Sequence, residues 1–231
     1  MEKGICYGVS IGPGQENLIT LEAIEIIKKA DVIFVPSFPK EECKAYQIIK
    51  KIMPDIDEKE ICPETFIMSR DASLMEERHK EIFANAKKYL DLGRTVAFLT
   101  LGEVAIYSTY LYIHEMLLEA GYTSVLVSGI SSIQAIAAKL NISLALGSEE
   151  LHIFPNAKDL EKKLSYDGTK VFMKTRVNLS EVIRNIQDYC EANEGVRACG
   201  ISNCGMDGEI IAYDVKALSN LEGYFTVLIV K

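Results

Sequence analysis

Residues 96–110 constrain the fold of this chain more than any other part of its sequence. They open with the apolar run 96–99, which has the length of a strand buried on both faces of a sheet. A Thr-Leu-Gly-Glu turn follows, and apolar residues then recur at helical spacing. The stripe of the expected helix comprises Ile106, Tyr110, Ile113 and Leu117. A strand that leads through a small-residue turn into a helix is typical of the ligand-binding edge of an open α/β sheet, although a strand-turn-helix without a ligand has the same pattern.

The rest of the N-terminal half alternates strand-like and helix-like segments in the same way, which predicts a parallel sheet. The expected strands are residues 4–10, 32–35 and 124–127, with a short edge strand at 66–69. The expected helices are residues 21–30 behind the N-cap residue Thr20, 44–53, and a long helix that Asp71 caps and that runs to Leu92. The charged segment 54–63 is expected to form a loop.

The C-terminal part has fewer helices between its strand-like segments, which indicates a mixed sheet. Its expected elements are helices 133–140 and 179–191, segments 150–154, 158–164 and 170–174, and strands 196–202 and 224–230. The small-residue turn 128–132 separates the two patterns. We therefore expect an α/β chain with two domains, residues 1–128 and 129–231.

Charge and hydropathy limit the possible partners. The chain has 25 Lys and Arg against 33 Asp and Glu, a net charge of −8. This balance, without a Lys/Arg-rich stripe, disfavours a nucleic-acid-binding surface. No apolar run approaches the roughly 20 residues of a membrane span, and residues 1–6 lead into a strand without the apolar core of a signal peptide. The sequence thus predicts a cytoplasmic protein with neither a nucleic-acid nor a membrane partner.

Cysteine and histidine spacing gives no sign of a metal site. The cysteines are at positions 6, 43, 62, 190, 199 and 204, and the histidines at 79, 114 and 152. No Cys-x-x-Cys pair occurs, and the histidines are far apart in sequence. We expect free thiols and no bound metal.

The loop Gly12-Pro13-Gly14 does not match a known phosphate-binding loop. Its glycine spacing differs from Gly-x-Gly-x-x-Gly, and no Lys-Ser/Thr pair completes a Walker loop. A proline between two glycines makes a rigid backbone with little side chain, which suits a flat approach to a large ligand. An ordinary tight turn is the alternative. In the loop after residues 96–99, Gly102 permits a similar approach and Glu103 adds a charge.

Four loops carry a resemblance to a known family. They are Gly12-Pro13-Gly14, Leu101-Gly102-Glu103, Gly129-Ile130-Ser131-Ser132 and Asn203-Cys204-Gly205. In this order they resemble the tetrapyrrole methylases, the class III S-adenosylmethionine-dependent methyltransferases, and the resemblance extends over residues 4–230. Residues 98–102 followed by Ile-Tyr-Ser-Thr-Tyr at 106–110 resemble the precorrin-2 C(20)-methyltransferases of vitamin B12 synthesis.

The resemblance implies two αβα domains with an active-site trough between them, a homodimer, S-adenosylmethionine as cofactor and S-adenosylhomocysteine as product. It implies that the cofactor contacts Pro13, Leu101, Gly102, Glu103, Ile106, Tyr107, Ser131, Ser132, Met173, Asn203, Cys204 and Thr226. Gly12 and Gly14 are assigned to the substrate. The implied substrate is precorrin-2 or cobalt-factor II. Leu111, Met116 and Leu118 are candidates for the dimer contact or, equally, for the core.

The sequence departs from the family pattern at three loops. Glu103-Val104 stands where the family has Asp-Pro, Gln15-Glu16 replaces another Asp-Pro, and Ser128 replaces a proline. Within the family the alternative is another precorrin methyltransferase. A diphthine synthase or a ribosomal RNA ribose methylase is more distant, and a non-catalytic protein that binds the cofactor is the alternative from another class.

The implied chemistry is displacement at the methyl carbon by a ring carbon, which depends mainly on alignment, so no catalytic acid or base is assigned. The implied substrate carries eight carboxylate arms, which a chain of net charge −8 repels at long range. A local cluster of cations must therefore bind them. The candidates are Arg70 and Arg176, with Lys174 beside the latter.

Overall fold

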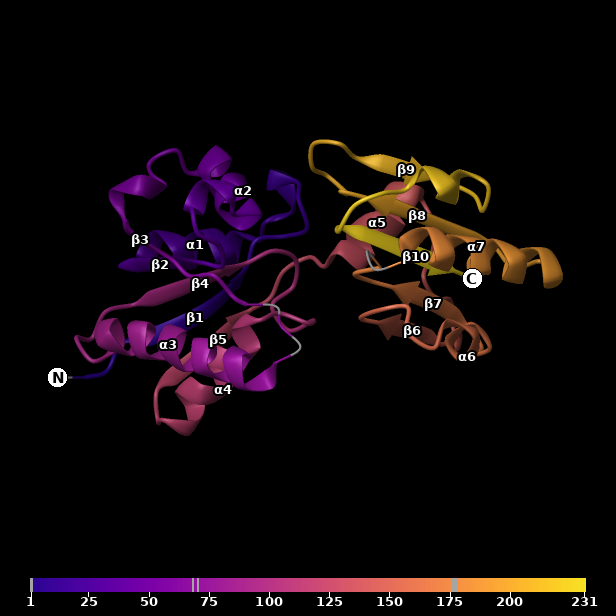
Figure 1. Ribbon diagram of the computed structural model, residues 1–231. Coiled ribbons are helices and arrows are strands. Elements are labelled where there is room, and N and C mark those ends of the chain that lie inside the picture. The colour runs from indigo at the N-terminus through magenta and orange to yellow at the C-terminus, as the bar shows by residue number, and fades with distance from the viewer. Residues whose placement is uncertain (1, 68, 70, 176–177) are drawn as a thin grey trace. The chain divides into compact units, whose positions relative to one another are not determined.

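The computed structural model describes residues 2–67, 69, 71–175 and 178–231. The chain forms two compact units, Met1–Ser131 and Ser132–Lys231. Each unit contains one five-stranded sheet (Figure 1). The predicted α/β class is confirmed.

The sheet of the first unit is entirely parallel, with the strand order β3-β2-β4-β1-β5. Its strands are β1 (Ile5–Ser10), β2 (Val32–Val35), β3 (Glu60–Pro63), β4 (Val96–Thr100) and β5 (Thr123–Val127). Its α-helices are α1 (Leu21–Lys29), α2 (Lys44–Ile52), α3 (Ala72–Leu90) and α4 (Tyr110–Glu119), and its 3-10 turns are η1 (Glu16–Leu18), η2 (Lys40–Glu42) and η3 (Ile56–Glu58). The parallel sheet expected from the alternating pattern is thus confirmed.

Helices cover both faces of this sheet (Figure 1). Ile33 and Val35 of β2 pack in one cluster with buried residues of α1 and α2. Val32 and Phe34, the alternate residues of the same strand, pack in a second cluster with α3 and α4. This two-sided burial explains why the strands are continuous apolar runs and do not alternate apolar with polar residues.

The predicted helix caps are confirmed. The Thr20 hydroxyl accepts a hydrogen bond from the Ala23 amide at 3.2 Å. The Asp71 carboxylate accepts from the amides of Ser73 at 3.0 Å and Leu74 at 3.3 Å. Each cap satisfies amides that the first helical turn leaves without an intrahelical partner.

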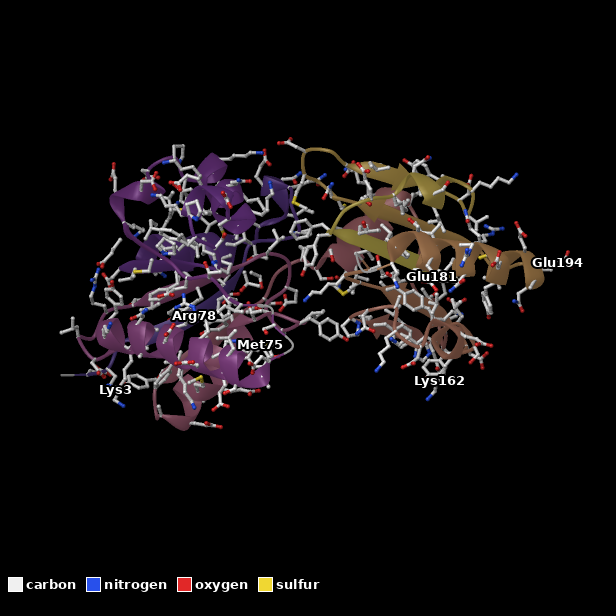
Figure 2. All side chains as sticks on the ribbon, in the orientation of Figure 1. Lys3, Met75, Arg78, Lys162, Glu181 and Glu194 are labelled. Carbon is white, nitrogen blue, oxygen red and sulfur yellow. The ribbon has the colours of Figure 1, made fainter. Side chains whose placement is uncertain are left out.

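The edge strand was predicted in the wrong place. Segment 54–63, expected as a loop, contains β3, and Thr65, Phe66, Ile67 and Ser69 form no strand, while Met68 lies outside the described residues. The proline in β3 is tolerated because this strand lies at the sheet edge. Arg78 of α3, labelled in Figure 2, binds the segment that follows: its Nε donates to the Thr65 carbonyl at 2.9 Å and its Nη2 to Glu64 at 2.6 Å.

The helix after β4 begins later than predicted, at Tyr110, so Ile106 lies in a turn outside it. Tyr107 has φ +54°, which interrupts any helix that would start before it. The Tyr110 ring occupies the space beside Gly8 of β1, where a Cβ atom would lie 2.2 Å from the ring. The packing of Tyr110 on β1 therefore helps to define where α4 begins.

The second unit has the mixed sheet that the sequence predicted, in the order β6-β7-β10-β8-β9. Its strands are β6 (Leu151–Phe154), β7 (Thr169–Phe172), β8 (Ala198–Ser202), β9 (Ile210–Ala212) and β10 (Thr226–Val230). Its helices are α5 (Ser132–Leu140), α6 (Leu160–Leu164) and α7 (Leu179–Ala192), with the 3-10 turn η4 (Ala217–Asn220). β6 and β7 are parallel, and β10 is antiparallel to both β7 and β8. Strand β9 was not predicted.

The two faces of this sheet pack in different clusters. Phe172 and Leu228 lie in a cluster with buried residues of α6 and α7. Val171 and Val227, one position away on the same strands, lie in a cluster with α5. The strand period of two thus assigns each side chain at the end of β7 to one face or the other.

The cap of α3 can be tested by substitution. We expect Asp71→Ala to lower the free energy of unfolding by about 1 kcal/mol, because two amides of the first turn lose their acceptor. Asp71→Asn keeps an acceptor oxygen and is the matched control. Urea unfolding followed by circular dichroism measures both variants, and equal losses would contradict the capping role.

Candidate functional site

Three loops of the first unit meet at one edge of its sheet. They follow β1, β4 and β5, which are parallel neighbours, so their carboxyl ends lie together. The Gly102 amide donates to the Gly12 carbonyl at 2.7 Å, and the Ile11 amide donates to the Thr100 carbonyl at 2.8 Å. The loop 11–14 after β1 and the loop 101–105 after β4 are therefore joined through their backbones. This is the edge at which open α/β sheets bind ligands.

Two glycines make this junction possible. Gly102 has φ +80°, and a Cβ placed on it would meet no atom within 4 Å, so the space in front of this backbone is open. At Gly129 a Cβ would lie 2.3 Å from the Cβ of Ser10, the last residue of β1. At Gly102 a glycine therefore permits a positive φ beside open space, whereas at Gly129 the absence of a side chain permits close packing between loops.

Glu103 connects the loop after β4 to the loop after β5. Its Oε2 accepts from the Gly129 amide at 2.6 Å and from the Ser128 hydroxyl at 3.2 Å, and its Oε1 accepts from the Ala105 amide at 2.9 Å. The Val104 amide next to it donates to the Ser10 hydroxyl at 2.9 Å. Glu103, expected as a cofactor contact, thus has both oxygens engaged in holding the loops. Ser128 supplies one of the donors.

The other predicted residues of this unit differ in exposure. Gly12, Pro13, Gly14 and Ser131 are buried, Leu101 and Ile106 are half-buried, and Tyr107 is exposed. Tyr107 combines exposure with a left-handed backbone conformation, which is uncommon for a residue with a Cβ and is found more often at functional sites than elsewhere.

In the second unit, the predicted residues lie at the ends of β7, β8 and β10. Met173 is half-buried beside the α5 cluster, and its amide donates to the Phe154 carbonyl at 2.8 Å. Asn203 has φ +53°, and its amide donates to the Phe225 carbonyl at 2.9 Å. Cys204 is buried and packs in the α5 cluster. Ser132, the first residue of α5, is half-buried.

Thr226 is fully buried, and its hydroxyl is engaged within the unit. The Thr226 and Ser202 hydroxyls are 2.8 Å apart, and the Thr226 hydroxyl also lies within donor distance of the Glu222 and Gly223 carbonyls. The side chain of Thr226 therefore holds the turn before β10. The cofactor contact predicted for Thr226 could therefore involve only its backbone.

Glu209, which was not predicted as a site residue, plays in this unit the part that Glu103 plays in the first. Its Oε2 accepts from the Gly205 amide at 2.6 Å and pairs with Lys139 of α5 at 2.6 Å. Burial alone would raise the pKa of Glu209, but these two partners outweigh it and the pKa is lowered. Glu209 therefore stays ionised and holds the loop 203–209 against α5. The glycines in that loop were the only signal in the sequence.

The predicted cation cluster is only partly described. Arg70 and Arg176 lie outside the described residues. Lys174 is half-buried with φ +50°, and burial lowers its pKa.

All six thiols are free and have raised pKa values, in each case chiefly through burial. The pKa rises to about 12 for Cys6 and about 11 for Cys199. None of these cysteines is therefore a thiolate nucleophile at neutral pH. Within the described ranges, His, Cys, Asp and Glu side chains do not gather in groups of three or more that could hold a metal ion. In the same part of the chain, every helix is too short or too polar to cross a membrane.

These features of fold and site agree with comparisons to known proteins. The profile of the tetrapyrrole (corrin/porphyrin) methylases matches residues 6–217, so the chain belongs to this family. The family assignment made from the four loops is confirmed.

Relatives within the family are more specific. The chain is 44% identical over 188 residues to a protein of Methanocaldococcus jannaschii named "Probable cobalt-precorrin-2 C(20)-methyltransferase", covering 79% of this chain and 78% of that protein. It is 28% identical to the cobalt-precorrin-2 C(20)-methyltransferase of Salmonella typhimurium, over 74% of this chain and 73% of that one.

A solved structure with the same fold is the uroporphyrin-III C-methyltransferase of Thermus thermophilus complexed with S-adenosylhomocysteine. The TM-score is 0.67 at 14% identity, and the match covers 98% of this chain and 92% of that one.

The role of Glu103 can be tested without any ligand. In Glu103→Gln the new amide group places a donor against one of the three donors that Glu103 now binds. Since a hydrogen bond to a charged group contributes about 1.5–3 kcal/mol, we expect the amides of Gly129 and Ala105 to exchange hydrogen about 10-fold faster or more. Hydrogen exchange measured by NMR tests this, with Glu22→Gln on the exposed side of α1 as control. Unchanged exchange at both amides would mean that the loops hold together without the carboxylate.

Proposed function

We propose that this protein is an S-adenosylmethionine-dependent methyltransferase that methylates C(20) of precorrin-2 or cobalt-factor II in cobalamin biosynthesis. The observation that carries this proposal is the 44% identity over about four fifths of the chain to a relative with that named activity. Another precorrin methyltransferase activity is the alternative within the family.

The described residues fit the proposed cofactor, which supplies an electrophilic methyl group on a sulfonium cation. Gly102 offers backbone beside open space, which suits a cationic ligand because carbonyl oxygens can approach it, and Leu101 and Tyr107 lie in the same connection between β4 and α4. Met173 offers a polarisable apolar wall for an adenine ring. Asn203 and Cys204 offer backbone groups that can form hydrogen bonds with the edge of the adenine ring. The proposed set is completed by Pro13, Ile106, Ser131 and Ser132.

In this proposal the protein acts chiefly by positioning. The six neutral thiols leave no cysteine nucleophile, and attack by the substrate's own ring carbon requires none. Glu103 and Glu209 act indirectly, because each holds a glycine-containing loop in place. Alignment of two bound reactants and exclusion of water can account for a large part of such a barrier.

The proposal is tested by incubating the protein with methyl-labelled S-adenosylmethionine and either precorrin-2 or cobalt-factor II. We expect label in the tetrapyrrole at C(20), located by NMR, and a preference for one of the two substrates that shows whether the ring must hold cobalt. Label at another ring carbon would identify a different precorrin methyltransferase. Cofactor binding without transfer to either ring would indicate a non-catalytic binding protein.

The cofactor position is tested at Gly102. We expect Gly102→Leu to weaken S-adenosylhomocysteine binding at least about 100-fold, because the side chain fills the open space in front of the loop. Gly121→Leu is a matched control, since Gly121 also has a positive φ and open space around an added Cβ but lies after α4. Calorimetry compares the two. Equal affinity in both variants would place the cofactor elsewhere.

We also propose a cytoplasmic homodimer. Six free, protonated thiols suit a reducing compartment. Tyr112 and Leu118 of α4 and Val125 and Leu126 of the edge strand β5 expose apolar surface, which a second copy would cover. Leu111 and Met116 are half-buried beside them. Sedimentation equilibrium at micromolar concentration tests the dimer.

A further inference from the structure

The second unit contains a cavity of about 410 Å³ that none of the predicted cofactor residues lines. It lies at the carboxyl ends of the parallel strands β6 and β7, where the loops 156–158 and 174–175 meet the first turns of α7. Leu160 and Val182, which belong to the cluster of α6 and α7, form its apolar wall. Met173 packs in the other cluster, with α5. The cavity therefore opens on the opposite side of the end of β7 from the proposed adenine wall.

Thr175 gives the first sign that the cavity accepts a polar ligand. Its side chain is 2% exposed and lines the cavity, and among the described residues its hydroxyl has no hydrogen-bond partner. A buried hydroxyl without a partner costs free energy, and most such groups in proteins are satisfied. A ligand oxygen in the cavity would satisfy this one.

The charges around the cavity favour an anion. Lys158 and Lys174 line it, and Glu181 is its one acidic residue among the described lining residues. The cavity also contains the N-terminus of α7, a helix of 14 residues whose N-cap residue Asn178 makes no side-chain cap. Uncapped amides at a helix N-terminus attract negative charge. Two cations, a helix N-terminus and a buried hydroxyl together make a site for a carboxylate.

We propose that this cavity binds a carboxylate arm of the tetrapyrrole substrate. The proposal rests on the proposed function, since a tetrapyrrole of that class presents several such arms. Lys158 supplies the exposed charge that first attracts the arm, and Thr175 and the amides of α7 supply the hydrogen bonds that orient it. Glu181 opposes binding of the arm and so limits affinity. The cavity also resolves the charge problem of an acidic protein with an acidic substrate, because local positive charge outweighs distant negative charge within about a Debye length.

Four variants test the cavity through steady-state kinetics with the preferred tetrapyrrole. We expect Lys158→Gln and Thr175→Val each to raise its KM about 5–10-fold, because each removes one partner of the carboxylate. Glu181→Gln should lower this KM about 2–3-fold, since it removes a like charge. Lys162→Gln on α6 is the matched control, because Lys162 is a lysine of the same region that does not line the cavity (Figure 2). Its KM should stay within about 2-fold of wild type.

The affinity for S-adenosylhomocysteine, measured by calorimetry, should be unchanged in all four variants and shows that each is folded. Lys158→Gln is expected to raise the tetrapyrrole KM and Glu181→Gln to lower it. Changes of KM in opposite directions distinguish a charge effect from general damage to the unit. Wild-type methyl transfer with the same KM in all four variants would overturn the cavity proposal and leave the function intact. If the wild type neither transfers the methyl group nor binds the tetrapyrrole when S-adenosylhomocysteine is present, the cavity proposal and the proposed function are both overturned. Displacement of the tetrapyrrole from wild type by inorganic phosphate alone, with no response to Lys158→Gln, would also overturn the carboxylate assignment.

Discussion

The candidate site of the first unit depends on the carboxylate of Glu103. In the sheet, β1 lies between β4 and β5, so the loops after β4 and β5 must connect across the end of β1. Glu103 makes this connection by accepting from the Gly129 amide, while Ser10 at the end of β1 accepts from the Val104 amide. The absence of a side chain at Gly129 lets these backbones approach. The carboxylate of Glu103 therefore joins the loop after β4 to the loop after β5.

The second unit uses the same device with different partners. Glu209 accepts from the Gly205 amide and pairs with Lys139, which ties a glycine-containing loop to α5. In each unit one acidic side chain holds a loop whose glycines leave it little conformational preference of its own. The loops can then present backbone atoms to a ligand in a fixed position, and the ordering cost is met by folding before the ligand binds.

The elements were predicted best where burial on one or two faces imposes a period on the sequence. The apolar run of β4 and the capped helices α1 and α3 are examples, since local contacts and burial point to the same structure. Prediction failed at β3, a short edge strand whose charged neighbours resemble a loop. It also failed at the start of α4, where apolar Ile106 continues the helical spacing but the positive φ of Tyr107 prevents a helix. In both cases a tertiary contact, the pairing of β3 with β2 or the packing of Tyr110 against Gly8, outweighs the local pattern.

The sequence by itself determined the α/β class, the parallel sheet of the first half, the mixed sheet of the second and the four glycine-containing loops that identify the family. These follow from hydrophobic period and from residue types that local backbone geometry requires. Only the tertiary structure decided what those loops contact. Glu103 and Gly129 are 26 residues apart, and Lys139 and Glu209 are 70 apart. Glu103 and Gly129 meet because strand order brings the loops after β4 and β5 to one edge, whereas Lys139 and Glu209 meet because α5 packs on the sheet of the second unit. The cavity beside Thr175 likewise forms where the ends of β6 and β7 meet α7. These arrangements are set by the packing of a whole unit and not by the residues near any one position.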